Sequence, residues 1–135
     1  MLFSFTISEC CLELEISATN IRLNNMIKGK YQYDQMHNGA PAYIRTTSPR
    51  MYLYWENNRW MMWKNLGQTF YCDPWWAFWN CREIYGWIRH DSHVQCPETI
   101  NNQWKSGFTK RIDSSIRVQC SEDNTETTTT KPGES

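Results

Sequence analysis

The sequence predicts a small all-β domain: a disulfide-stabilised antiparallel sandwich or barrel with an aromatic core. Short segments that alternate apolar and polar residues are separated by turn residues, and there is little helical periodicity. Leu, Ile, Val and Phe number only 23 of the 135 residues, whereas eight Trp and seven Tyr supply large side chains for a core. Six cysteines, an even number, indicate three disulfides.

The first half of the chain contains three segments with the alternation of a strand that is buried on one face. These segments are residues 11–16, 29–33 and 42–46. Asn38-Gly39-Ala40-Pro41 separates the last two and is typical of a turn, because glycine supplies a positive φ and proline cannot donate to a central ladder. Ser48-Pro49 then turns the chain toward the next strands.

Residues 52–63 predict a β-hairpin with a two-residue turn at Asn57-Asn58, because asparagine tolerates the left-handed backbone of such turns. The turn fixes the register, in which the facing pairs are Glu56 and Arg59, Trp55 and Trp60, Tyr54 and Met61, Leu53 and Met62, and Tyr52 and Trp63. Glu56 and Arg59 are expected to form an ion pair. Both faces are aromatic, so the hairpin is either covered on two sides or carries an exposed aromatic patch.

The second half of the chain is less regular. Residues 72–81 have no clear period, which favours a disulfide-pinned loop or a single helical turn. Residues 82–89 predict another short strand, and residues 113–120 alternate as the last strand of the domain. Because the first and last strands each carry a cysteine, we expect the sheet to close there.

Composition divides the chain into three parts. Residues 1–8 are an N-terminal segment with the character of a degenerate secretory signal, since they are apolar but lack a basic residue. Residues 9–120 form the β domain. Residues 121–135 are Thr-rich and predict a disordered tail or a linker, the latter in a larger multidomain chain. No run approaches the ~20 apolar residues that a membrane span needs.

The cysteines predict an oxidising, extracellular compartment, either secreted or at the cell surface. Six cysteines allow about 15 pairings, and spacing alone does not choose among them. The pairing that we favour joins Cys72 to Cys81 and Cys96 to Cys120. The adjacent Cys10 and Cys11 cannot easily bridge each other, so at least one of them should reach elsewhere in the chain or to another chain.

A set of motifs in the chain resembles a small Cys- and aromatic-containing module that recurs in secreted and membrane-anchored multidomain proteins of marine invertebrates. The motifs are Gly29-x-Tyr31, Asn38-Gly39-x-Pro41-x-Tyr43, Tyr52-Leu53-Tyr54-Trp55, Trp60, Cys96-Pro97, Trp104 and Ile116-x-Val118-x-Cys120. The resemblance covers residues 29–120 and implies an interaction or structural module without enzymatic activity. The Trp-rich segment 72–81 and the pair Cys10-Cys11 are not part of that pattern.

Binding is the function that the residues favour, and the best candidates are aromatic. The candidate surface consists of Trp75, Trp76 and Trp79, followed by Tyr52, Tyr54 and Trp63. Such side chains recognise proteins or stack on sugar rings, so we expect a protein partner, with a glycan ligand as the alternative. The competing interpretation is that the Trp cluster plugs one end of the barrel as part of the core.

Other chemistries are weaker in this sequence. His90, His93 and Cys96 have a spacing that zinc could use, but Cys96 is better used in a disulfide. Ser114, Ser115, His90 and Asp113 could be combined into a triad, but there is no local nucleophile motif, so we expect no enzyme and no cofactor.

An intracellular zinc-binding or nucleic-acid-binding protein is a further alternative. Residues 16–119 hold 13 Lys and Arg against 7 Asp and Glu, a net charge of +6. That alternative requires reduced cysteines, so we expect no nucleic-acid partner.

Overall fold

The computed structural model describes residues 10–75 and 78–121, together with all side chains in these ranges except those of Trp75, Phe78 and Trp79. Its elements are β1 (Glu13–Ser17), α1 (Ile21–Ile27), β2 (Gly29–His37), β3 (Ala40–Arg45), β4 (Tyr52–Glu56), β5 (Arg59–Trp63), β6 (Phe70–Trp75), β7 (Phe78–Glu83), β8 (Ile88–Asp91), the 3-10 helix η2 (Pro97–Thr99), β9 (Lys105–Ser106) and β10 (Arg117–Cys120). The predicted all-β fold is confirmed.

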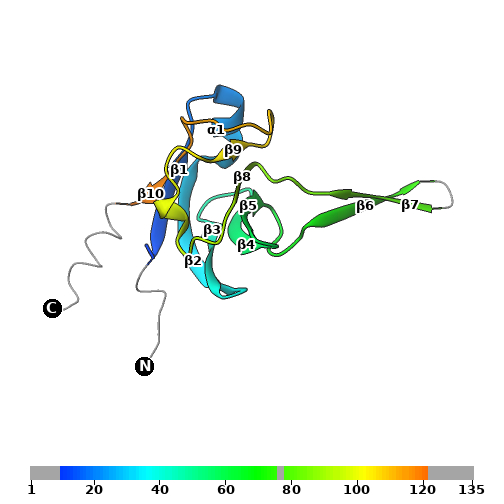
Figure 1. Ribbon diagram of the computed structural model, residues 1–135, viewed down its shortest axis with the longest axis horizontal. Helices are drawn as coiled ribbons and strands as arrows, with labels where there is room; N and C mark the ends of the chain where they lie inside the picture. Colours follow the sequence, from blue (N-terminus) through cyan, green and yellow to red (C-terminus); the bar gives the residue numbers. More distant parts are fainter. Residues whose placement is uncertain (1–9, 76–77, 122–135) are drawn as a thin grey trace.

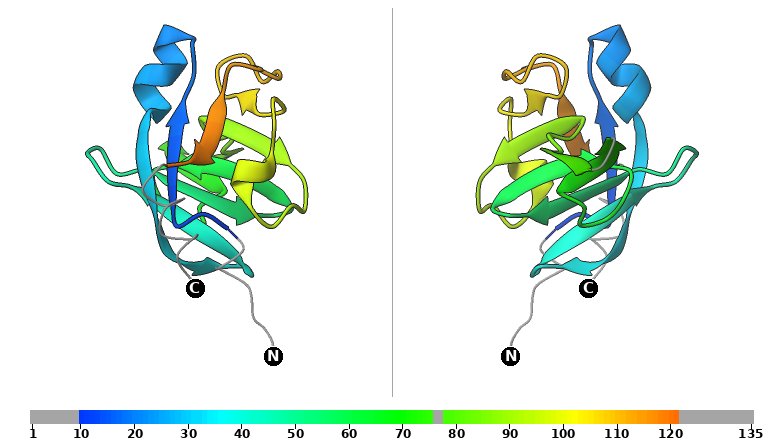
Figure 2. Two further views of the ribbon diagram at one scale, coloured as in Figure 1. Left: turned by 90° about the vertical axis from the view of Figure 1, so that its left-hand side faces the viewer. Right: turned by 90° about the vertical axis from the view of Figure 1, so that its right-hand side faces the viewer.

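Eight of these strands form one antiparallel sheet in the order β10-β1-β2-β3-β4-β5-β8-β9. The sheet curls into a half-barrel, which is the barrel-like form of the predicted fold (Figure 2). As predicted, the first and last strands pair, with Leu14 opposite Cys120. The remaining strands, β6 and β7, pair with each other as a second sheet. They extend from the body as a long ribbon on the side away from β1 and β10, and we call this ribbon the arm (Figure 1).

The hairpin of β4 and β5 has the predicted register in all five pairs, from Tyr52 opposite Trp63 to Glu56 opposite Arg59. Asn57 and Asn58 both have positive φ, 52° and 63°, as the two-residue turn requires. One face of the hairpin lies in the main core and contributes Leu53, Trp60 and Met62. The other face contributes Tyr54 and Met61 to a smaller cluster with Ala42 and Ile84. The hairpin is therefore covered on both sides.

The predicted ion pair between Glu56 and Arg59 is wrong. Arg59 instead places Nη2 3.1 Å from Oε2 of Glu83, at the base of the arm. Glu56 contacts the His37 ring and accepts a hydrogen bond of 2.9 Å from Asn38 Nδ2. These partners lie outside the hairpin in the sequence. The hairpin register therefore could not show that Glu83 would bind Arg59, or that His37 and Asn38 would bind Glu56.

Helix α1 was not expected from the sequence. It has only seven residues and buries two of them, Leu23 and Ile27, which are four positions apart. Asn20 caps its first turn by accepting a 2.9 Å hydrogen bond from the Leu23 N–H. A helix of about two turns is too short for the 3.6-residue period of its apolar residues to be recognised in the sequence. Its packing on the sheet stabilises it.

Two predictions for the second half of the chain also need correction. Residues 72–75 and 78–81 are not the predicted loop or helical turn, because they are paired strands of the arm. Residues 82–89 are not one strand, since β7 ends at Glu83 and β8 begins at Ile88. Gly86 lies between them with φ +93°, where an added Cβ would be 3.0 Å from the carbonyl oxygen of Met62. The chain thus bends sharply where it passes close to β5.

The core is aromatic, as predicted. Its largest fully buried side chains include Trp60, Trp104, Tyr31, Tyr43 and Tyr54. Each buried phenol donates to a backbone carbonyl: Tyr31 to Ile27, Tyr43 to Cys11, and Tyr54 to Gln68, at 2.6–2.7 Å. The hydroxyl groups of these three tyrosines are therefore satisfied inside the core.

All six cysteines are paired in three disulfides. Cys72–Cys81 is the predicted bridge and crosses the arm. The predicted bridge Cys96–Cys120 is wrong, because Cys10 pairs with Cys96 and Cys11 with Cys120. Neighbouring residues in extended backbone point in opposite directions, so Cys10 reaches the loop before η2 while Cys11 reaches β10. Within residues 10–75 and 78–121, no helix combines the length and apolar character of a membrane span.

Candidate functional site

The arm is an amphipathic ribbon that exposes its apolar face. Side chains alternate between the two faces of a strand, so Phe70, Cys72 and Pro74 of β6 share one face. The Cys72–Cys81 disulfide brings Cys81 of β7 onto that face as well. All four residues are exposed, Phe70 to 59% of its full area. An amphipathic sheet normally buries its apolar face against another layer, and no described element covers this one.

The opposite face of the arm is polar at residues 71, 73, 80 and 82. Tyr71, Asp73, Asn80 and Arg82 alternate with the apolar set, and the Tyr71 hydroxyl donates to Asp73 Oδ2 at 2.7 Å. This hydrogen bond, followed by the charge of Asp73, raises the pKa of the Tyr71 phenol. The two faces of the ribbon therefore have different chemistry.

A hollow of about 440 Å³ lies where the arm leaves the body. It is lined by Trp63, Lys64, Asn65, Gln68 and Tyr71. Gln68 organises it, because its Oε1 accepts hydrogen bonds from Trp63 Nε1 at 3.0 Å and from Asn65 Nδ2 at 2.8 Å. Two aromatic walls with amide and ammonium groups between them make a pocket of the size and mixed polarity that small ligands occupy.

The base of the arm is attached firmly to the body. Glu83 accepts from Arg59, with 3.1 Å between Nη2 and Oε2, and lies 3.9 Å from Nη1 of Arg89. Ile84, directly after β7, is buried in the smaller core cluster. The Ile84 N–H donates to the carbonyl of Thr69 at 2.8 Å, which continues the pairing of the arm into the body.

Of the six predicted binding residues, the structure describes the side chains of Tyr52, Tyr54 and Trp63, and it gathers these three at the smaller core cluster rather than on an exposed patch. Trp76 and the side chains of Trp75 and Trp79 lie outside the described residues, although the register pairs Trp75 with Phe78 and Pro74 with Trp79 on the outer half of the arm. Tyr54 is fully buried and is therefore a core residue rather than a surface one. The half-buried Trp63 lines the hollow, and the half-buried Tyr52 packs against the smaller core cluster.

Phe70 and Tyr71 were not singled out in the sequence. A signal was present, since residues 70–74 alternate Phe, Tyr, Cys, Asp and Pro as an amphipathic strand does. The alternation is short, because the residues from 75 to 79 are almost all aromatic and have no period of two.

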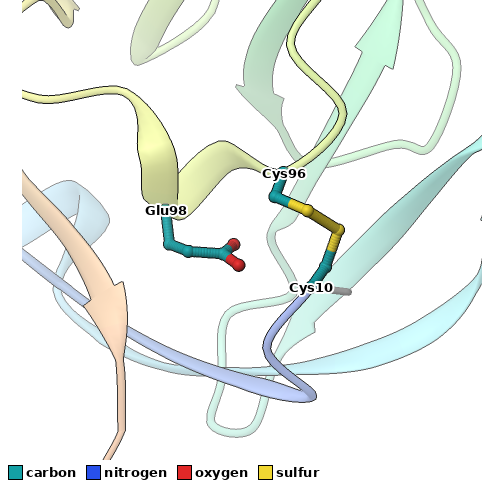
Figure 3. Close-up of side chains that lie close together, drawn as sticks. All are labelled: Cys10, Cys96 and Glu98. Atoms are coloured by element: carbon teal, nitrogen blue, oxygen red, sulfur yellow. A yellow bond between two sulfur atoms is a disulfide. The ribbon is translucent and has the colours of Figure 1, made fainter. Parts of the chain in front are cut away.

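A second cluster surrounds the carboxylate of Glu98 on η2. A carboxylate oxygen of Glu98 lies within 4.8 Å of the sulfur atoms of Cys10 and Cys96. A carboxylate oxygen of Glu98 also lies within 4.8 Å of the sulfur atoms of Cys11 and Cys120. Figure 3 shows the carboxylate turned toward the Cys10–Cys96 disulfide. Oε2 accepts a 3.0 Å hydrogen bond from the Cys11 N–H, whereas the buried Oε1 has no hydrogen-bond partner among the described residues. Disulfide sulfurs are not thiolates, so this arrangement holds the fold together rather than a zinc ion.

Burial raises the pKa of the Glu98 carboxyl, although the N–H groups of Glu98 and Cys11 act in the opposite direction. A raised folded-state pKa means that the fold favours the neutral acid. The stability that this supplies is complete below the unfolded-state pKa and is lost as pH rises through the folded-state value. We expect Glu98→Gln to raise the melting temperature at pH 7 by a few degrees and to change it little at pH 4. Thermal unfolding at both pH values measures this, and a variant that is less stable at pH 7 would contradict it.

The residues considered for metal binding and catalysis have other contacts. Cys96 is bonded to Cys10, the His90 ring lies 6.1 Å from that of Trp104, and the His93 ring lies 5.9 Å from that of Trp55. Asp113 accepts a 2.7 Å hydrogen bond from the Ser115 hydroxyl and a bond from the Ser115 N–H, which is the geometry of a local turn. Among the described residues, the groups of three possible metal ligands are those around Glu98, and they include neither histidine.

Known proteins do not identify the chain. No protein-family model, no curated protein and no solved structure matches it. The resemblance to the marine-invertebrate module stays a prediction.

Proposed function

We propose that the chain is a non-enzymatic extracellular binding module that recognises a protein partner through the arm. The observation that carries the proposal is the exposed apolar face formed by Phe70, Pro74 and the Cys72–Cys81 disulfide. Apolar surface that no element of the fold covers is where binding sites of soluble proteins are found, and this face is small, so the partner is expected to contact the arm beyond it as well. Three disulfides agree with an extracellular compartment.

The construction of the arm supports a role in binding. A two-stranded hairpin alone is marginally stable in water, because it has no sheet or helix to pack against. The disulfide between β6 and β7 and the attachment of Glu83 to Arg59 supply stability that the missing layer would otherwise provide. A preformed arm loses little conformational entropy when it binds, and this improves affinity.

A glycan ligand is the second candidate, and the hollow beside Tyr71 favours it. Trp63 offers an aromatic wall on which a sugar ring can stack, while Asn65 and Lys64 offer hydrogen-bond donors to hydroxyl groups. The third alternative, an intracellular zinc or nucleic-acid function, needs reduced cysteines, and all six are oxidised in this structure.

We expect Phe70→Ser to weaken binding to the protein partner at least about tenfold while leaving the melting temperature nearly unchanged, because Phe70 is exposed. The measurement is a screen of the full chain against purified extracellular protein domains and against a glycan array. Phe108→Ser is the matched control, since Phe108 is also exposed, to 39%, but lies on the body. Protein binding that survives Phe70→Ser contradicts the proposal. Glycan binding that Trp63→Ala abolishes and Phe70→Ser leaves intact would establish the second candidate instead.

A further inference from the structure

The hydrogen-bond pattern of the arm shows which backbone groups face outward. The Cα atoms of Cys72 and Cys81 are 4.0 Å apart, a separation typical of a non-hydrogen-bonded pair in an antiparallel ladder. Pro74, two positions along, has no N–H to donate and fits the same kind of pair. The hydrogen bond from the Ile84 N–H to the Thr69 carbonyl shows that Thr69 and Ile84 are a hydrogen-bonded pair. Hydrogen-bonded and non-hydrogen-bonded pairs alternate along an antiparallel ladder, so the next pair, Phe70 and Glu83, is of the non-hydrogen-bonded kind. On β6 the C=O groups of residues 70, 72 and 74 and the N–H groups of 70 and 72 therefore point away from the partner strand. On β7 the same holds for the N–H and C=O groups of residues 79, 81 and 83.

The two outer edges of the arm differ. On β6 the outward carbonyl of Phe70 accepts a 2.9 Å hydrogen bond from Gln68 Nε2, and Pro74 has no N–H to offer. Both features are ways in which proteins prevent a strand edge from pairing. On β7 the outward backbone groups of Trp79 and Cys81 form no hydrogen bond beyond the hairpin within the described part of the chain. The β6 edge is thus blocked at Phe70 and Pro74, whereas the β7 edge offers both its N–H and C=O groups at Trp79 and Cys81.

The size of the arm indicates that a partner must use more than one face. Six residues at about 3.3 Å each give a ribbon about 20 Å long and, with two strands, about 10 Å wide, so that one flat face offers only about 200 Å². A stable protein interface buries about 800 Å² on each partner. Pairing at the β7 edge adds main-chain hydrogen bonds and lets the same partner extend over the apolar face.

Charge indicates what kind of strand fits this edge. Arg82 lies on the polar face of β7, is exposed, and forms no ion pair with the described residues. On an added strand, the residue directly opposite Arg82 would lie within reach of the guanidinium group. The two residues of the added strand that flank this position would lie opposite Cys81 and Glu83, on the face that carries Phe70 and the disulfide.

We propose that the partner protein adds an extended segment to the outer edge of β7 as a third strand of the arm. The segment alternates polar and apolar residues, with apolar side chains on the Phe70 face and an acidic side chain opposite Arg82. This inference rests on the proposed function and specifies how the arm binds.

The test uses a blocked nine-residue peptide, Thr-Val-Ser-Val-Asp-Val-Ser-Val-Thr, whose sequence is the same in both directions and therefore fits either strand orientation. We expect saturable binding to the full chain, with slower hydrogen exchange of the Cys81 amide measured by NMR. The same peptide with Lys in place of Asp should bind about fivefold more weakly, because attraction to Arg82 becomes repulsion.

The matched variants are Trp79→Pro and Trp79→Val. Both remove the indole, but only proline removes the outward N–H, and it does so at a position where the ladder to β6 needs no donor. Trp79→Pro should lower peptide affinity at least about tenfold relative to Trp79→Val. NMR spectra of both variants verify that the hairpin remains formed.

Equal affinities of the two variants would overturn the inference, as would an absence of saturation and of Cys81 protection at about 1 mM peptide. Protection of Cys81 that depends on protein concentration without peptide would show that a second copy occupies the edge, which also overturns it. The protein screen separates the two proposals. Binding lost in Phe70→Ser but kept in Trp79→Pro means that the arm binds by its face alone, whereas binding kept in both variants means that the arm is not the binding site.

Discussion

Replacing Cys11 and Cys120 together by alanine is expected to lower the free energy of unfolding by about 3–4 kcal/mol. These residues are 109 positions apart in the sequence. Because Cys10–Cys96 stays in place, however, the lost bridge closes an effective loop of only about 25 residues in the unfolded chain. The Cys11–Cys120 disulfide also holds β1 beside β10, where the sheet closes. A domain of this size has a total stability of roughly 5–15 kcal/mol, so the double variant should be near the limit of folding.

Urea denaturation of the variant and the wild-type domain measures this effect. The control is Cys72→Ala with Cys81→Ala, because that disulfide closes a separation of only nine residues. Its loss should cost about 2–3 kcal/mol by the same entropic reasoning. Equal losses in the two double variants would show that loop length does not determine the contribution of these disulfides.

Trp60→Ala is expected to destabilise the domain by about 3–5 kcal/mol, because it removes the largest kind of side chain from a fully buried position. The indole of Trp60 also donates to the Val94 carbonyl at 2.9 Å. Trp60→Phe keeps most of the apolar area but leaves that carbonyl without its donor, at a cost of about 1–3 kcal/mol.

Trp104→Phe is the matched control for the hydrogen bond of Trp60. Trp104 is also fully buried, but its Nε1 has no hydrogen-bond partner among the described residues. Removing this N–H therefore breaks no bond, and we expect Trp104→Phe to cost less than Trp60→Phe. Thermal and urea unfolding of the two variants would decide this, and a reversed order would contradict the assignment of the bond from Trp60 to Val94.

Local rules explain why parts of the fold could be predicted from the sequence. The hairpin of β4 and β5 needs only its Asn57-Asn58 turn to set the register, and all five predicted pairs are present. The aromatic core likewise follows from composition, because Trp and Tyr are the large side chains that the chain contains in quantity. The Cys72–Cys81 bridge was predictable because its cysteines are close in sequence.

Features that depend on distant parts of the chain could not be predicted in this way. The ion pair of Arg59 goes to Glu83, 24 positions away, because the arm begins beside β5. The disulfide partners of Cys10 and Cys11 are Cys96 and Cys120, because η2 and β10 both approach the start of β1. No local sequence pattern encodes that approach. The arm could not be predicted as a hairpin, because the alternation of residues 70–74 is lost in the run of Trp and Phe from residue 75 to residue 79.

The closure of the sheet by Cys11 and Cys120 has a mechanical consequence. If tension pulls on the segments before residue 10 and after residue 121, the covalent bond between these cysteines carries the force directly from one segment to the other. Cys10–Cys96 provides a second covalent link close to the same place. The strands between them, and the arm on the far side of the body, then bear almost no load (Figure 1). Such a domain can keep its binding surface folded while the chain on either side of it is stretched.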